Sequence, residues 1–234
     1  MADQPLKIMH VLLSRGFAGS ERSTAESCNE QCKNHEVILV IRRDHRKNGQ
    51  SIVDHIDPQV TVIELPKFLG TQRALKRAIA KTQPQVIHCH LRRSTRLVAK
   101  VNPAAATLST LHISFNGPHY WQMDGIVCNA RWQLDDIPEG YPGTTFKANN
   151  ALVPQRRLDD DERRRLRASL GVKTDEYLIA GVGRYHKSKA WDTLIDAFKK
   201  LPQHAKARVI FFGSGRLKSV LEEQAVDDVR IRFS

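Results

Sequence analysis

The sequence is poor in the features that mark secreted, disulfide-bonded or membrane-spanning proteins. It has 4 cysteines in 234 residues and no C-x-x-C pair. Cys28 and Cys32 lie one helical turn apart, and Cys89 and Cys128 fall in expected strands. No apolar run approaches the length of a membrane-spanning helix, and the amino terminus, MADQPLKIMHVLL, lacks the pattern of a signal peptide. We therefore expect reduced thiols and a cytoplasmic location.

Two common ligand signatures are also absent. Gly16 and Gly19 do not fit the G-x-G-x-x-G fingerprint of dinucleotide-binding proteins. The run 88–90, HCH, could join His112 as metal ligands, but a strand sends its two histidines to one face and its cysteine to the other. No companion motif with zinc spacing is present. We therefore expect no metal and no cofactor.

Acidic residues are outnumbered, with 37 lysines and arginines against 25 aspartates and glutamates, a net charge of +12. A basic chain favours anionic partners such as a nucleotide, a phosphorylated glycan, an anionic membrane surface or nucleic acid. Aromatic residues make up only 6% of the chain and no nucleic-acid-binding module is recognisable, so RNA binding rests on charge alone. The arginine-rich stretch 159–170 opens with acids and continues with arginines, which predicts an exposed helix that pairs its own charges.

Apolar runs of strand length alternate with helical patterns along the whole chain. This alternation predicts an α/β fold with parallel sheets and helices on both faces. The expected strands are 8–13, 36–42, 60–65, 85–89, 106–111, 125–129, 177–182, 207–212 and 229–233. The expected helices are 20–33, 69–82, 130–136, 159–170, 191–201 and 216–224, the first of them capped by Ser20.

The stretch 177–201, YLIAGVGRYHKSKAWDTLIDAFKKL, combines a strand, a glycine turn, two cations and a helix. Arg184 and Lys189 follow the carboxyl end of the strand, at the edge where α/β sheets bind ligands. The start of the next helix adds free N–H groups and a partial positive charge. By itself, the pattern fits either a phosphate site or a pair of solvated cations.

This stretch resembles the G-R-L-x-x-x-K-G-x-x-x-L-I-x-A-F signature of GT-B glycosyltransferases, specifically the large retaining family four. In that family the arginine and the lysine bind the donor diphosphate, which the resemblance carries over to Arg184 and Lys189. The glycine that usually follows the lysine is Ala190 here. Because alanine is a good helix former, we expect the helix to start normally and the site to survive.

Shorter segments resemble the same family in the same order. AGSERS resembles the G-G-S/A-E-R loop, which makes Gly19 a donor-phosphate residue although Ala18 replaces the first glycine. PQVIHCHL resembles a strand that ends at the cleft with His90, and TLH resembles the T-x-H segment. The resemblance implies that His112 binds a hydroxyl of the donor sugar, and it is the candidate catalytic residue. The further cleft-lining residues that the resemblance implies are Gly16, Asn129, Gly213 and Gly215.

The resemblance implies two Rossmann-like parallel-sheet domains, the second of them incomplete. Residues 1–152 would form the acceptor-side domain, and residues 153–234 the linker and the first part of the nucleotide-sugar-binding domain. The stretch 145–153, TFKANNALV, resembles the segment that enters the linker. The family's paired-glutamate motif, which holds the donor ribose and sugar, comes later than Ser234 in the family order. We therefore expect a carboxyl-terminally truncated chain.

Together these segments imply metal-independent transfer of a sugar from a nucleotide-sugar donor to an acceptor hydroxyl, with retention of configuration. The basic surface fits an anionic or membrane-bound acceptor, a glycan or glycolipid such as the lipopolysaccharide core, and peripheral contact with the inner face of the cell membrane. The alternative is a catalytically inactive truncated module that binds only nucleotide or polyanion. No nucleic-acid partner is expected.

Overall fold

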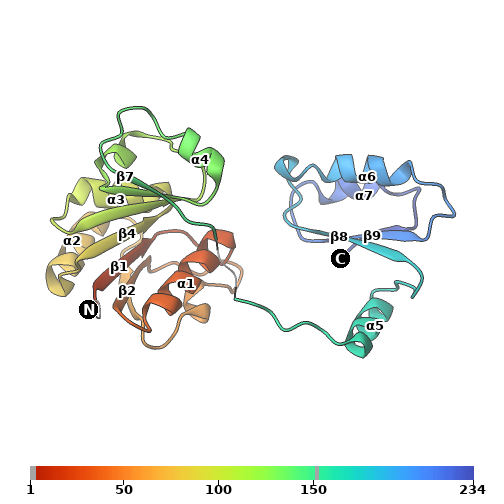
Figure 1. The fold of residues 1–234 in the computed structure, drawn as a ribbon, viewed down its shortest axis with the longest axis horizontal. Helices are drawn as coiled ribbons and strands as arrows, with labels where there is room; N and C mark the ends of the chain where they lie inside the picture. Colours follow the sequence, from red (N-terminus) through yellow and green to blue (C-terminus); the bar gives the residue numbers. More distant parts are fainter. Residues whose placement is uncertain (1–3, 151–152) are drawn as a thin grey trace. The chain divides into compact units, whose positions relative to one another are not determined.

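The chain separates into two compact units, residues 1–154 (unit 1) and 155–234 (unit 2) (Figure 1). The computed structural model describes residues 4–150 and 153–234. The domain boundary expected between residues 152 and 153 falls beside residues 151–152, which lie outside the described residues. Within the described ranges, no helix has both the length and the apolar composition needed to cross a membrane.

Unit 1 is built on a seven-stranded, all-parallel sheet in the order β3-β2-β1-β4-β5-β6-β7. Its strands are β1 (Lys7–Leu12), β2 (Glu36–Arg42), β3 (Thr61–Leu65), β4 (Val86–His90), β5 (Ala106–Leu111), β6 (Gly125–Cys128) and β7 (Thr144–Lys147). The sequence predicted all of these except β7. That strand lies at the edge of the sheet and all four of its residues are exposed, so it lacks the apolar pattern that reveals the others.

Helices cover both faces of this sheet, because its strands are apolar on both sides. The helices of unit 1 are α1 (Gly19–Gln31), α2 (Thr71–Thr82), α3 (Leu91–Val101) and α4 (Arg131–Asp135), with short 3-10 turns η1 (Ile52–His55) and η2 (Pro118–Gln122). Ala25 and Cys28 of α1 pack against Leu39 of β2. Leu75 of α2 and Val98 of α3 belong to a second core cluster on the opposite face. The predicted fold class is confirmed for this unit.

The expected cap of the first helix was wrong. Helix α1 begins at Gly19, and its N-cap residue is Ala18 rather than Ser20. The Ala18 amide donates a hydrogen bond to the buried Glu21 carboxylate at 3.0 Å, and the Ser20 hydroxyl donates to the same oxygen. Glu21 therefore supplies the second half of a capping box, reaching back from the first turn to accept from the amide of the N-cap residue.

Unit 2 contains a three-stranded parallel sheet in the order β10-β9-β8. Its elements are α5 (Asp160–Ser169), β8 (Tyr177–Val182), η3 (Lys187–Lys189), α6 (Trp191–Lys199), β9 (Ala207–Phe212), α7 (Lys218–Gln224) and β10 (Ile231–Phe233). Figure 1 shows α6 and α7 on one face of the sheet. Phe198 and Leu221 from these helices pack with Val209 and Phe211 in a single core cluster. The sheet, its order and its helices agree with the predicted α/β class.

Candidate functional site

Two glycine loops meet at the carboxyl ends of β8 and β9. A side chain on Gly213 would put its Cβ 2.0 Å from the carbonyl oxygen of Gly183, and one on Gly215 would lie 2.4 Å from the carbonyl oxygen of Tyr185. The Tyr185 amide donates a hydrogen bond of 2.9 Å to the carbonyl of Ser214. Both positions therefore require glycine, because the two backbones are in contact there and any side chain would collide with a carbonyl oxygen.

Arg184 and Lys189 lie on the loop between β8 and α6, beside these glycines. Both side chains are exposed, and neither forms an ion pair with an acidic residue in the part of the chain that the structure describes. The indole N–H of Trp191 donates to the carbonyl of Arg184 at 2.9 Å, which ties the loop to the helix that follows. The Lys189 Cε lies 3.8 Å from where a Gly183 Cβ would be, so its aliphatic stem runs along the glycine turn.

Ala190 precedes the helix, so its helix propensity does not decide where α6 starts. It is the N-cap residue, and it has φ of +49° and ψ of 41°. This left-handed conformation favours glycine, because an alanine Cβ crowds the following carbonyl there. Helix α6 does begin at the expected residue, Trp191, so the substitution strains the loop without moving the helix.

The first turn of α6, which follows this loop, contains backbone amides without a hydrogen-bond acceptor in the described part of the chain. The side chain of Ala190 cannot cap the helix. No described residue accepts a hydrogen bond from the amides of Trp191, Asp192 or Thr193. Free amides at a helix start attract anions. Arg184 and Lys189 precede these amides on the same loop, and the first turn itself carries one acid, Asp192.

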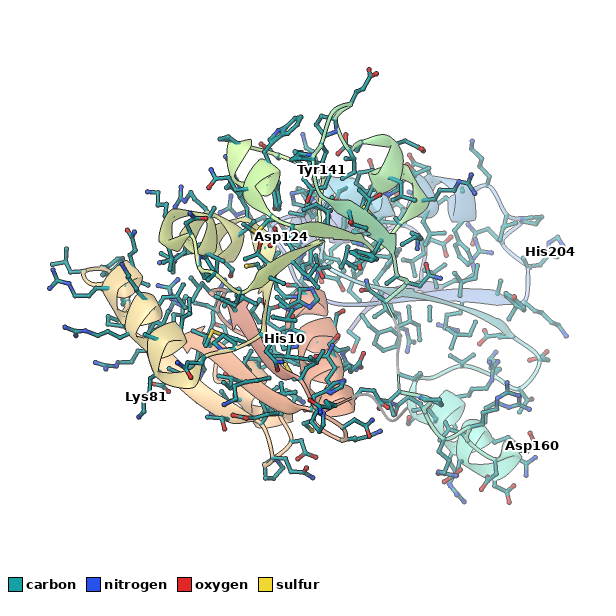
Figure 2. All side chains as sticks on the ribbon, turned by 60° about the vertical axis from the view of Figure 1, so that its left-hand side comes forward. His10, Lys81, Asp124, Tyr141, Asp160 and His204 are labelled. Atoms are coloured by element: carbon teal, nitrogen blue, oxygen red, sulfur yellow. The ribbon has the colours of Figure 1, made fainter. Side chains whose placement is uncertain are left out.

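Unit 1 contains a different kind of site, a row of hydrogen-bonded histidines. His10 on β1 lies within the sheet (Figure 2). Its Nε2 is 2.7 Å from the Gln31 Oε1 on α1, and its Nδ1 is 2.9 Å from the His90 Nε2 on β4. The His90 Nδ1 is in turn 3.3 Å from the His112 Nε2, just after β5. We call these four residues the histidine row.

Burial keeps the imidazoles of this row neutral. It lowers the pKa of His10 to about 4, and it lowers the pKa of His90 and His112 below their ordinary value. A neutral imidazole has one donor and one acceptor nitrogen. The Gln31 oxygen must accept, so His10 donates from Nε2, His90 donates to His10, and His112 donates to His90. The Nδ1 of His112 is thereby left as an acceptor, beside a hollow of ≈ 180 Å³ that His112 helps to line.

The histidines also form the one grouping among the described residues that has the spacing of a metal site. Ring nitrogens of His10, His88 and His90 all lie within 4.8 Å of one another. Two of these rings already share a hydrogen bond, and the His88 Nε2 lies 2.7 Å from the Thr110 hydroxyl. As expected, the two histidines of the HCH run share a face, while Cys89 joins the core on the other side. The expectation of no metal remains a prediction.

The remaining predicted residues of unit 1 occupy separate places around the carboxyl edge of the sheet. Gly16 has φ of +84° and its amide donates to the carbonyl of His45 at 2.7 Å, so it makes a tight turn. Gly19 starts α1, with no atom within 4 Å of where its Cβ would be. His90 and Asn129 line one hollow of ≈ 420 Å³ beside α1. His112 is linked to this group through His90.

Sequence reasoning missed His10 and Gln31. Both appear ordinary in the sequence, one in an apolar strand and the other at the end of a polar helix. The signal that could have found His10 is strand order, because β1 and β4 are neighbours and place His10 opposite His88. Gln31 offers no comparable signal.

Comparison with known families supports the resemblance in part of the chain. Residues 162–227 match the family described as glycosyl transferases group 1, which is less than half of the chain. The match runs from α5 to α7 and includes Arg184, Lys189 and both glycines of the second loop. No curated protein matches the chain.

Solved structures match both units. The Anabaena protein Alr3699/HepE, crystallised with UDP and glucose, is 14% identical with a TM-score of 0.76, over 97% of this chain and 68% of that one. A glycosyltransferase from Rickettsia africae is 17% identical with a TM-score of 0.79, over 99% and 68%. WaaG, a glycosyltransferase of lipopolysaccharide biosynthesis, is 13% identical with a TM-score of 0.67, over 97% and 69%. At such identities the likeness shows the fold, which is that of GT-B glycosyltransferases.

Proposed function

We propose that this chain provides the acceptor-side domain and donor-binding residues of a glycosyltransferase, which moves a sugar from a nucleotide-sugar to an acceptor hydroxyl. The observation that carries the proposal is the loop of Arg184 and Lys189 against the glycine pair Gly213 and Gly215. This arrangement lies within the segment that matches glycosyl transferases group 1. The fold, shared with glycosyltransferases, supports the same proposal.

Arg184, Lys189 and the free amides of α6 bind the diphosphate of the donor. The difficult step in sugar transfer is departure of this diphosphate, and fixed positive charge stabilises the charge that develops on it. Because this cluster needs no further cation, we propose that transfer is independent of a metal. Retention of configuration, by attack on the same face that the diphosphate leaves, rests on the family signature around Arg184.

His112 positions the donor sugar. With its N–H donated to His90, the Nδ1 of His112 accepts a hydrogen bond from a sugar hydroxyl. The histidine row thus sets which way this hydrogen bond runs, because reversing it would require every imidazole in the row to change its tautomer.

UDP is the first nucleotide to test, since HepE was crystallised with UDP and with UDP-glucose. The acceptor that we propose is a glycan or glycolipid of the cell surface. The fold shared with WaaG, which takes part in lipopolysaccharide biosynthesis, supports that proposal.

The test is binding of UDP, GDP and ADP to the chain by isothermal titration calorimetry. We expect one nucleotide to bind, and the Arg184→Ala/Lys189→Ala variant to bind it at least about 100-fold more weakly, since each charge-assisted hydrogen bond contributes roughly 1.5–3 kcal/mol. The Lys173→Ala/Lys200→Ala variant removes the same charge from exposed positions of unit 2 and should bind like wild type.

Equal nucleotide affinities in all three proteins would refute the phosphate site. Binding that responds to Arg184 and Lys189, without sugar transfer or donor hydrolysis, would instead favour the alternative of an inactive nucleotide-binding module. Metal independence is tested by adding EDTA to an assay of sugar transfer, which should leave the rate of transfer unchanged.

A further inference from the structure

A groove between α2 and α3 collects cations on the surface of unit 1. Its volume is ≈ 790 Å³, and the loop before α2 forms one rim. We call it the basic groove and define it by five cations and two apolar residues. These are Arg73, Lys76, Arg93, Arg96 and Lys100 with Phe68 and Leu69.

None of these five cations forms a salt bridge within residues 4–150 and 153–234, although Asp44 acts electrostatically on Arg93 in the direction that raises its pKa. The contrast with α5 is clear, because its Arg163 pairs with Asp160 at 2.8 Å and Arg156 pairs with Glu162 at 2.5 Å. Repulsion adds to the effect of burial at Arg93, whose pKa is lowered first by burial and then by Arg42. Such a concentration of unpaired charge favours an anionic partner.

The cationic surface continues across α3. A second hollow of ≈ 480 Å³ on the other side of this helix shares Arg96 and Lys100 with the basic groove and adds Arg92. It is also lined by His119, but burial lowers the pKa of His119, so this residue adds no positive charge. The charge is therefore spread over the width of two helices, which fits an extended anionic surface better than a single phosphate.

Large apolar side chains stand exposed at the rim. Phe68 is 72% exposed and Leu69 is 93% exposed, so neither contributes to the core. The Lys67 ammonium lies 4.8 Å from the centre of the Phe68 ring, and it also pairs with the Asp44 carboxylate at 3.7 Å. Neighbouring apolar and cationic side chains on one surface are the pattern that binds at a membrane interface. A dissolved polyanion would leave Phe68 and Leu69 in water.

We propose that the basic groove docks unit 1 onto a bilayer rich in anionic phospholipid. Phe68 and Leu69 enter the boundary between headgroups and acyl chains, while the five cations contact lipid phosphates. Exposed cations contribute to such binding through the negative potential of the membrane surface. The proposal does not depend on the proposed function, because it uses no residue of the nucleotide site.

The test is co-sedimentation of the full chain with vesicles of phosphatidylcholine alone or mixed with phosphatidylglycerol. We expect binding only to the mixed vesicles. The Arg73→Glu/Lys76→Glu variant should bind at least about 25-fold more weakly, on the basis of about fivefold for each cation lost. The control Arg77→Glu/Lys81→Glu changes the net charge equally on the same helix but outside the groove (Figure 2 labels Lys81), and should lose less than about fivefold.

A second variant separates insertion from charge attraction. Phe68→Ser/Leu69→Ser keeps every cation. It should weaken binding to mixed vesicles at least about tenfold, because the wild-type complex buries two apolar side chains in the bilayer and the variant does not. Its binding to heparin, a dissolved polyanion, should not change. All substituted residues are exposed, so each variant should unfold at the wild-type temperature.

Three outcomes would overturn the proposal. Equal vesicle binding by the serine variant and wild type would show that nothing inserts. Equal losses in both charge-reversal variants would show attraction to net charge without a defined surface. An RNA oligonucleotide that displaces the protein from mixed vesicles, and whose own binding needs Arg73 and Lys76, would assign the groove to nucleic acid. Nucleotide binding by unit 2 should be unaffected in every variant.

Discussion

The two units hold polar groups at the edge of their sheets by different kinds of contact. Unit 2 uses backbone, with Gly213 and Gly215 packed against the loop that carries Arg184. Unit 1 uses side chains, with His10 and His90 joined in a row that ends at His112. A backbone site is encoded by residues close together in the sequence. A side-chain row depends on strands that are distant in the sequence.

The difference extends to how the charges are balanced. Unit 2 pairs cations with acids even where they are buried, as at Arg230 and Asp228, which lie 2.7 Å apart. Among the described residues, Arg184 and Lys189 form no such pair. In unit 1, burial rather than ion pairing determines the charge of the histidines. It lowers the pKa of His10 and His90, so both remain neutral. The loop of Arg184 and Lys189 in unit 2 therefore depends on fixed charge, and the histidine row of unit 1 on the absence of charge.

The largest expected effect comes from a side chain on the glycine loop. Gly213→Ala should destabilise unit 2 by at least about 3 kcal/mol, because its Cβ would lie 2.0 Å from the Gly183 oxygen, which is backbone and cannot move aside alone. Hydrogen exchange followed by mass spectrometry measures the loss in peptides of each unit. The control Gly19→Ala adds a Cβ with no atom within 4 Å and should change stability by less than about 0.5 kcal/mol. If unit 2 were equally protected from hydrogen exchange in Gly213→Ala and Gly19→Ala, contact between the two backbones would not be the reason for glycine at position 213.

Acid should destabilise unit 1 through its histidines. Between pH 6.5 and about 4 the unfolded chain binds a proton at His10 that the folded chain does not, since burial lowers the folded pKa of His10 to about 4. The free energy of unfolding therefore falls as the pH falls across this window, by about 3 kcal/mol for His10 alone. Hydrogen exchange in unit 1 peptides at several pH values measures it.

The matched variants for this prediction are His10→Asn and His204→Asn. The first removes the titrating group, so stability should lose part of its dependence on pH, whereas the second replaces an exposed histidine of unit 2 and should keep that dependence. Constant stability of wild-type unit 1 from pH 6.5 to pH 4 would contradict the neutral histidine row.

The smallest effect concerns the strained start of α6. Ala190→Gly should stabilise unit 2 by about 0.5 kcal/mol, because relief of the left-handed alanine exceeds the entropy that glycine adds to the unfolded chain. The control Ala130→Gly changes another N-cap, of φ −127°, where alanine is unstrained, so it gains only the N-cap preference for glycine and should stabilise less than Ala190→Gly. Urea unfolding measures both. An equal or larger gain in Ala130→Gly, or a destabilised Ala190→Gly variant, would show that φ does not govern the difference.

The same contrast explains what the sequence could predict. The bounds of β8 and β9 agree with the expected strands, since an apolar run flanked by glycine is a local signal. The positions of Arg184 and Lys189 at the end of β8 follow from that run. The α/β class follows from alternation along the whole chain. Each of these properties depends on neighbours in the sequence.

What could not be predicted depends on contacts between distant residues. His10 and His90 are 80 positions apart, and only the pairing of β1 with β4 brings them together. The left-handed Ala190 follows from the preceding turn rather than from helix propensity. Strand β7 is held by pairing with β6 and carries no buried residue of its own.

The order of strands in unit 1 has a consequence for synthesis on the ribosome. Strand β1 lies between β2 and β4, and its Lys7 amide bonds to Gln85, 78 positions later. At about 5–20 residues per second, the ribosome reaches β4 roughly 4–16 s after it has synthesised β1. Until then β1 can pair only with β2. During this interval one edge of an apolar strand is open to other chains. We expect nascent chains that stop before β4 to be chaperone clients, and those extended past β5 to leave the chaperone.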